Sequence, residues 1–146
     1  MIFIGKILHS LDNKNRMRIP AVFRSQYDKE KMKFIMLFNP NGSIGIYTED
    51  AFEKLIAKYE NVSAFDDEIQ EDYTRFFSNV YYVEEDNHKR IILSEEAREH
   101  TGIKKDLITV GKSNHFEIWA AEKHREVLAR KSLKSTYSNI NEQEKQ

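Results

Sequence analysis

The chain has 146 residues, of which 32% are charged and 40% hydrophobic, a balance typical of a folded globular protein of one ordinary domain or two very small ones. Its 24 acidic and 23 basic side chains give a net charge of −1, which excludes a global basic field, so any nucleic-acid site must be local. The absence of cysteine excludes disulfide scaffolds, thiolate zinc sites and cysteine nucleophiles, and no apolar stretch approaches the roughly 20 residues needed to cross a bilayer.

The predicted elements, taken in chain order, form one series that occurs twice. The first series has a strand-like run over 6–11, a polar motif over 12–20, a helix-like segment over 20–27, β-runs over 34–38 and 43–47, and a helix from Glu49. The second has a strand-like run over 80–84, a motif over 86–94, a helix-like segment over 94–100, β-runs over 107–110 and 115–119, and a helix from Glu122. Because order and spacing both recur, the sequence predicts two homologous units, over residues 5–52 and 79–124.

Cap residues support this series. Pro20 suits the first position of a helix because it lacks the N–H that would be unpaired there. Ser94 can cap the corresponding helix of the second unit, and Thr101-Gly102 supplies a stop at the end of that helix.

An amphipathic helix is predicted between the two units, in the most acidic part of the chain. It spans residues 64–78, with one apolar stripe formed by Ile69, Tyr73, Phe76, Phe77 and Val80. Residues 60–86 hold nine acids against the single Arg75, whereas residues 12–33 hold seven Lys and Arg against three acids. This division indicates two surfaces with different partners, although two solvated faces of unlike charge would give the same pattern.

The two ends of the chain carry weaker signals. Residues 1–6 lack the basic start, long apolar run and small-residue cleavage site of a secretory signal, so we expect a cytoplasmic protein without membrane contact. Residues 125–146 comprise the end of the last helix and, from Ser132, a polar tail without apolar periodicity, which we expect to be disordered.

Neither unit is expected to be stable alone. Domains of about 45 residues usually need a metal, a disulfide or association, and the chain has no cysteine. We therefore predict a mainly β, α+β fold in which the two units close on each other into one barrel-like core with helices outside.

The motif carries the candidate binding residues. Along an extended segment Lys14, Arg16 and Arg18 would share one face of a β-ribbon, and Asp12 could fix the loop by accepting from backbone N–H groups. A two-stranded ribbon fits the major groove of DNA, where arginine can bind guanine through two hydrogen bonds. The alternative is a solvated hairpin edge that is charged only to prevent aggregation.

The chain resembles the MraZ family of bacterial transcriptional regulators over residues 1 to about 130. The resemblance rests on Gly5, His9, Leu11 and Asp12, on the Asp-x-Lys-x-Arg-x-x-x-Pro run over 12–20, on the second Asp-x-x-x-Arg over 86–90, and on Glu117-Ile118-Trp119. It implies two tandem AbrB-like swapped-hairpin modules related by a pseudo-twofold axis, a ring-like homo-oligomer and a place at the nucleoid. It also implies binding to repeated boxes in the promoter of the protein's own operon, at the head of the division and cell-wall gene cluster, usually as a repressor.

The resemblance assigns DNA binding to both copies of the motif. The candidate DNA-binding residues are Lys14, Arg16, Arg18, His88, Lys89 and Arg90, supported in their loops by Asp12, Asn15, Pro20 and Asp86. The second copy is the weaker reader, because His88 replaces the lysine and Ser94 the proline. Asn15 and Lys89 stand where the family has glycine. Asn15 tolerates a left-handed turn, whereas Lys89 is either strained there or part of a turn of different shape.

No catalytic group, metal site or cofactor site is predicted. Gly111-Lys112-Ser113 imitates the end of a phosphate-binding loop but lacks the first glycine, and Glu96 with His100 lacks a third metal ligand. Two functions remain for a non-enzymatic chain. One is a sequence-specific DNA-binding regulator, and the other is a structural or protein-interaction module that uses the acidic 60–86 region.

Overall fold

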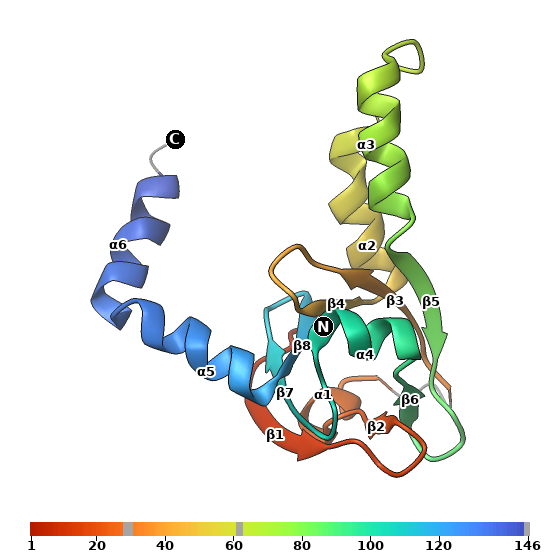
Figure 1. The fold of residues 1–146 in the computed structure, drawn as a ribbon, viewed down its shortest axis with the longest axis vertical. Helices are drawn as coiled ribbons and strands as arrows, with labels where there is room; N and C mark the ends of the chain where they lie inside the picture. Colours follow the sequence, from red (N-terminus) through yellow and green to blue (C-terminus); the bar gives the residue numbers. More distant parts are fainter. Residues whose placement is uncertain (28–30, 61–62, 145–146) are drawn as a thin grey trace.

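The computed structural model describes residues 1–27, 31–60 and 63–144. Within these residues the strands are β1 (Lys6–Ser10), β2 (Arg16–Arg18), β3 (Lys33–Phe38), β4 (Ile44–Tyr47), β5 (Val80–Glu84), β6 (Arg90–Ile92), β7 (Asp106–Gly111) and β8 (His115–Ala120). The helices are α1 (Ala21–Arg24), α2 (Glu49–Ile56), the 3-10 helix η1 (Ala57–Tyr59), α3 (Asp67–Phe77), α4 (Glu95–Thr101), α5 (Ala121–Arg130) and α6 (Leu133–Glu144). Two helical projections leave the body of strands: the hairpin of α2, η1 and α3, and the C-terminal arm of α5 and α6 (Figure 1).

The large sheet is antiparallel and combines strands of both units. Its order is β1-β7-β8-β4-β3-β5, so β1 pairs with β7, β4 with β8 and β3 with β5. Exchanging each strand for its equivalent in the other unit reverses this order into itself, which places a pseudo-twofold axis between β4 and β8. The predicted mainly β, α+β fold of two interlocked units is thereby confirmed.

The closed barrel expected from the sequence is not formed, because β1 and β5 remain the two edges of the large sheet. The strands that follow them in the chain, β2 and β6, leave the sheet and pair with each other in a separate two-stranded ribbon. Met17 of β2 and Ile91 of β6 are fully buried in the main core, so the ribbon packs against the sheet instead of closing it.

The main core is shared by the two units, as predicted. Phe3 and Phe23 of the first unit contact Phe116 of the second at ring-centroid distances of 5.3 and 5.0 Å. Along β3 the side chains alternate between two cores. Phe34 and Met36 point into the shared core, whereas Ile35 belongs to a smaller cluster covered by α2.

Most predicted helices are confirmed, with shifted ends. The helix expected over 20–27 is shorter, since α1 ends at Arg24, and Pro20 is its N-cap instead of its first helical residue. The Ser94 hydroxyl caps α4 by accepting from the Ala97 N–H at 3.1 Å, and Gly102 ends that helix with a φ of 74°. The helix predicted over 64–78 is α3, which Asp66 caps at its start.

The expectation of a disordered tail from Ser132 is wrong for residues 133–144, which form α6; residues 145–146 lie outside the described residues. Ser132 starts the helix, because its hydroxyl accepts from the Ser135 N–H at 3.1 Å. The helical stripe of Leu133, Tyr137 and Ile140 is sparse among polar neighbours, and sequence reasoning missed it. In the described part of the chain, no helix combines the length and the apolar character needed to cross a membrane.

Candidate nucleic-acid interface

The two motifs form one ribbon, with one strand from each unit. In the pairing of β2 with β6, Arg16 lies opposite Ile92, Met17 opposite Ile91, and Arg18 opposite Arg90. Met17 and Ile91 face the core, so the other face of the ribbon presents Arg16, Arg18, Arg90 and Ile92. The sequence places Arg16 and Arg18 on one face but does not reveal that Arg90 joins them there.

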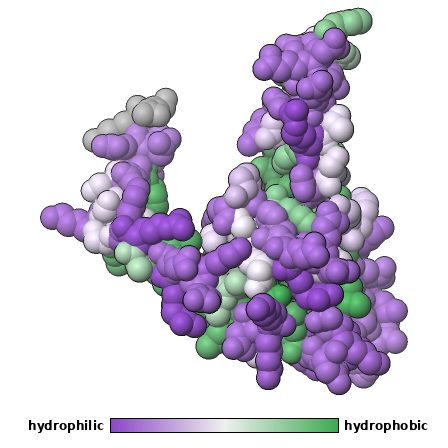
Figure 2. Space-filling model, viewed as in Figure 1, coloured by the Kyte–Doolittle hydropathy of each residue, from purple (hydrophilic) through white to green (hydrophobic). Residues whose placement is uncertain are grey.

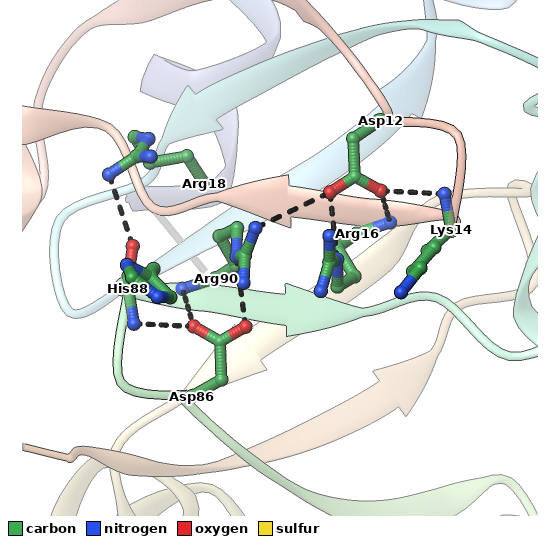
Figure 3. A network of polar contacts seen from close by, with 7 residues as sticks. All are labelled: Asp12, Lys14, Arg16, Arg18, Asp86, His88 and Arg90. Atoms are coloured by element: carbon green, nitrogen blue, oxygen red, sulfur yellow. Dashed lines mark hydrogen bonds and ion pairs between the residues drawn. The ribbon is translucent and has the colours of Figure 1, made fainter.

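The first motif loop is held by Asp12. One oxygen of its carboxylate accepts from the backbone N–H groups of Lys14 at 2.9 Å and Arg16 at 3.0 Å, and the other accepts from the Nε of Arg16 at 2.7 Å (Figure 3). The backbone donor of Arg16, aided by its guanidinium and by the Lys14 N–H, lowers the pKa of Asp12 to about 2. The loop-fixing role expected for Asp12 is thus present in the structure.

The second motif loop repeats this geometry around Asp86. Its carboxylate accepts from the backbone N–H groups of His88 at 2.8 Å and Arg90 at 3.1 Å, and from the Nε of Arg90 at 2.9 Å. Desolvation opposes ionisation here, but the hydrogen bonds from Arg90 and His88 prevail and the pKa of Asp86 is lowered.

The two turns have the same backbone shape. Asn15 has a φ of 60° and Lys89 a φ of 63°, both in the left-handed region that favours glycine. Of the two possibilities left open for Lys89, a turn of different shape is therefore wrong. The aspartate that closes each loop imposes the same left-handed residue on both.

Several contacts join the two motifs across the ribbon. The guanidinium of Arg18 donates to the backbone carbonyl of His88 at 3.0 Å. The Asp12 carboxylate also lies 3.7 Å from the guanidinium of Arg90. Figure 3 shows the two loops at opposite ends of the ribbon, with the arginines between them. The result is one continuous surface with Lys14 at one end and His88 at the other.

The candidate residues differ in exposure. Lys14, Arg18 and His88 are exposed, whereas Arg16 and Arg90 are half-buried, with 24% and 22% of their side chains exposed beside their aspartates. Half-burial and an ion pair hold these two guanidiniums in fixed directions, while the exposed cations stay free to follow a partner. Asn15 and Lys89 are half-buried within their turns.

Pro20 and Ile92 alter the predicted set. Pro20 is buried behind the ribbon as the N-cap of α1, so it positions the chain and cannot touch a ligand. Ile92 lies on the same face as the three arginines and is 57% exposed. Sequence reasoning missed it, although its place two residues after Arg90 in an extended strand is a signal that could have found it.

The surroundings of the ribbon favour an anionic partner. Figure 1 shows the α2–α3 hairpin, which carries most of the acidic 60–86 region, at the opposite end of the molecule from β2 and β6; residues 61–62 of that region lie outside the described residues. Across residues 1–27, 31–60 and 63–144, no three His, Cys, Asp or Glu side chains gather closely enough to hold a metal ion.

Comparison with known proteins places this surface in a family context. The family model described as "MraZ protein, putative antitoxin-like" matches residues 2–72 and 76–144. A protein of Chlorobium limicola named "Transcriptional regulator MraZ" is 31% identical over 143 residues, which span 86% of this chain and 89% of the relative. Proteins of the same name are 32% identical in Clostridium botulinum, over 84% of each chain, and 29% identical in Syntrophomonas wolfei, over 97% of this chain and 95% of the relative. Both motifs fall within the matched ranges.

Proposed function

The chain belongs to the MraZ family, since the family model matches both of its halves, and from that membership we propose that it is a sequence-specific DNA-binding regulator of transcription. Relatives that align with most of its length are named as transcriptional regulators. The partner is double-stranded DNA, and the β2–β6 ribbon is the part of the protein that enters its major groove. No cofactor and no catalytic step belong to this function.

The observation that carries the proposal is the convergence of three arginines from two units on one face of the ribbon. A two-stranded β-ribbon is narrow enough to lie in the major groove, where an arginine can bind the O6 and N7 of guanine together. Arg16 and Arg90 suit this role because their aspartates fix the direction of each guanidinium. Lys14 and Arg18 are exposed and suit phosphate or guanine contacts.

The low net charge favours a multivalent mode of binding. A chain with a net charge of −1 and a single small basic surface should bind one DNA box weakly. We therefore propose that the protein acts as a homo-oligomer on repeated boxes in the promoter of its own operon, the division and cell-wall operon that the resemblance implies. Repression, a cytoplasmic location and association with the nucleoid belong to the same proposal.

A mobility-shift titration with the protein's own promoter fragment, repeated at rising salt, tests the proposal. The logarithm of the affinity should fall linearly with the logarithm of the salt concentration, by about 0.9 for each phosphate that is neutralised. Lys14→Ala combined with Arg18→Ala should reduce that slope and weaken binding, whereas Lys54→Ala, on the α2–α3 hairpin, should change neither. Binding that is equally tight to a scrambled fragment would exclude sequence-specific recognition.

A further inference from the structure

The helix α6 has an uncovered apolar stripe. Leu133, Tyr137 and Ile140 recur at helical spacing and are 70%, 60% and 54% exposed. None of the described residues of α6 is buried. In Figure 1 the helix stands apart from the body of the molecule at the end of the C-terminal arm, and in Figure 2 apolar side chains lie along the inner side of that arm.

A helix of this kind needs a partner. Isolated helices shorter than about 12–15 residues are marginal in water even when their composition is favourable. The 12 residues of α6 include Ser, Thr and Asn, which are weak helix formers. Packing of the apolar stripe against another surface would supply the stabilisation that the chain itself does not provide.

A matching surface lies between the α2–α3 hairpin and β5. A cavity of about 320 Å³ has an apolar lining formed by Ile35, Phe52, Ile56, Phe77 and Val80. Tyr81 and Tyr82 also line it and are 40% and 63% exposed, which is unusual for large aromatic side chains on neighbouring positions of a strand. Their alternation along β5 widens the aromatic surface around the cavity.

The charges of the two surfaces are complementary. Residues 49–60 and 63–77 carry nine acidic side chains against three basic ones, and Glu49 and Glu53 of α2 line the cavity itself. Residues 127–141 carry Arg130, Lys131 and Lys134 and no acid. A basic helix with an apolar stripe therefore matches an acidic apolar groove.

We propose that α6 of one copy of this chain docks in the groove between α2 and β5 of a second copy. Tyr137, at the centre of the stripe, fills the cavity, and the cations at the start of the helix lie beside Glu49 and Glu53. The two surfaces point away from each other in one molecule (Figure 1), so the contact is head to tail and extends from copy to copy until rotation closes it. This contact needs no DNA, and its failure would leave the proposed DNA binding untouched.

The absence of native cysteine allows a direct test by disulfide trapping in the full chain. One variant carries Tyr137→Cys and a second carries Tyr82→Cys. The two are mixed and oxidised, and the products are separated by mass without reductant. We expect a covalent pair of the two variants, at a yield well above that of the matched control mixture of Tyr137→Cys with Val22→Cys, which places the second thiol on α1. Equal yields in the two mixtures would overturn the proposal.

Two further variants separate this contact from other occupants of the groove. Tyr137→Glu puts a charge into an acidic apolar groove and should raise the dissociation constant between copies by at least about tenfold, as seen by light scattering. Asn139→Glu makes the same charge change on the same helix away from the stripe and should leave assembly intact. Unchanged assembly of Tyr137→Glu contradicts the proposal. So does a Tyr137→Cys, Tyr82→Cys double variant that crosslinks within single chains at high dilution.

A second and independent observation concerns Ile92. It lies directly opposite Arg16 and shares the exposed face of the ribbon with three arginines. Its equivalent in the first unit is Arg18, since each is the last residue of its short strand. An exposed isoleucine at the centre of a cationic surface gains nothing from phosphates, but the C5-methyl of thymine is an apolar group on the major-groove edge.

Resting on the proposed DNA binding, we infer that Ile92 contacts a thymine methyl in each box. Replacing thymine by uracil in the boxes removes the methyl and keeps every phosphate and hydrogen-bonding group. Wild-type affinity should then fall by about fourfold for each contacted methyl, the value of one buried carbon. Ile92→Ala should bind both fragments equally, whereas Val22→Ala should behave as wild type. Equal wild-type binding to both fragments would overturn this inference, while absence of binding to either would instead overturn the proposed function.

Discussion

Asp12 of the first motif and Arg90 of the second form an ion pair of 3.7 Å across the ribbon, although they are far apart in the sequence. The same carboxylate oxygen binds Arg16 at 2.7 Å, so one side chain orients an arginine from each unit. Asp86, by contrast, pairs with Arg90 alone among the described residues. The pseudo-twofold arrangement is therefore unequal at the surface that we propose binds DNA, and Asp12 is its more influential aspartate.

The lowered pKa of Asp12 predicts a defined loss of stability in acid. Its pKa is about 2 in the folded chain against an ordinary value of 3.8, so its ionised form stabilises the fold above about pH 4, and this contribution disappears as the pH falls towards 2. The difference in urea midpoint between wild type and Asp12→Asn should be constant from about pH 5 upwards and should shrink between about pH 4 and 2. Glu99→Gln, a carboxylate change outside both motifs, is the control. A difference that stays constant across this range would contradict the assigned role.

The two motifs should contribute unequally to recognition. Arg16→Ala should cost about 1–3 kcal/mol of discrimination for the promoter boxes, the value of a lost bidentate guanine contact. Arg90→Ala should cost less, because Lys14 and Arg18 assist Arg16, whereas the neighbours of Arg90 are His88 and Ile92. Competition binding against a scrambled fragment measures both, with Arg75→Ala on α3 as the control. If neither substitution weakens specific binding, the ribbon is not the recognition surface.

The left-handed backbone of Lys89 predicts a stabilising substitution. A side chain at a φ of 63° costs about 1–2 kcal/mol that glycine avoids, so Lys89→Gly should raise the free energy of unfolding by about 1 kcal/mol. Asn15→Gly should raise it less, since asparagine tolerates this conformation. Urea denaturation at neutral pH measures both. Destabilisation by Lys89→Gly would mean that side-chain contacts of Lys89 outweigh the backbone strain.

These comparisons show which features the sequence can predict. Helix caps at Ser94 and Gly102 depend on local chemistry, and the structure contains both. Alternation along the motif correctly places Met17 and Ile91 inside and the arginines outside. Neither signal identifies which strand lies beside which. The pairing of β2 with β6 is set by the packing of the two units, so the sharing of one surface by Arg16 and Arg90 is visible only in three dimensions.

The errors of the sequence analysis have physical causes too. Barrel closure requires the edge strands to meet, but no residue pattern records whether a sheet of half-buried strands closes or stays open. The tail was misjudged because three apolar residues in twelve fall below the periodic density of a helix that packs on its own chain. That density is sufficient for a helix that packs on a neighbour.

The strand pairing predicts that half of the chain cannot fold. Within residues 1–60 the only pairing of named strands that remains is β3 with β4, because β1, β2 and β4 each pair with a strand of the second unit and β3 also loses β5. The aromatic core would lose Phe116, which contacts Phe3 and Phe23. Circular dichroism and sedimentation of residues 1–60 should show an unfolded or aggregated product. A monomer that unfolds cooperatively would refute the shared core.

Multivalent binding predicts a strict dependence on the spacing of the DNA boxes. Subunits in one assembly hold their ribbons at fixed positions, so a second box is bound at high effective concentration, commonly 10²–10⁴-fold above independent binding, only when it lies on the same face of the duplex. Insertion of about 5 base pairs between boxes rotates the second box to the opposite face, and insertion of about 10 restores it. Affinity should fall by roughly 10²-fold or more with the first insertion and recover largely with the second. Tyr137→Glu, which we expect to dissociate the assembly, should bind all three fragments with the same low affinity. If wild-type affinity is insensitive to a half-turn insertion, or to removal of all boxes but one, each subunit binds alone and the multivalent mode is wrong.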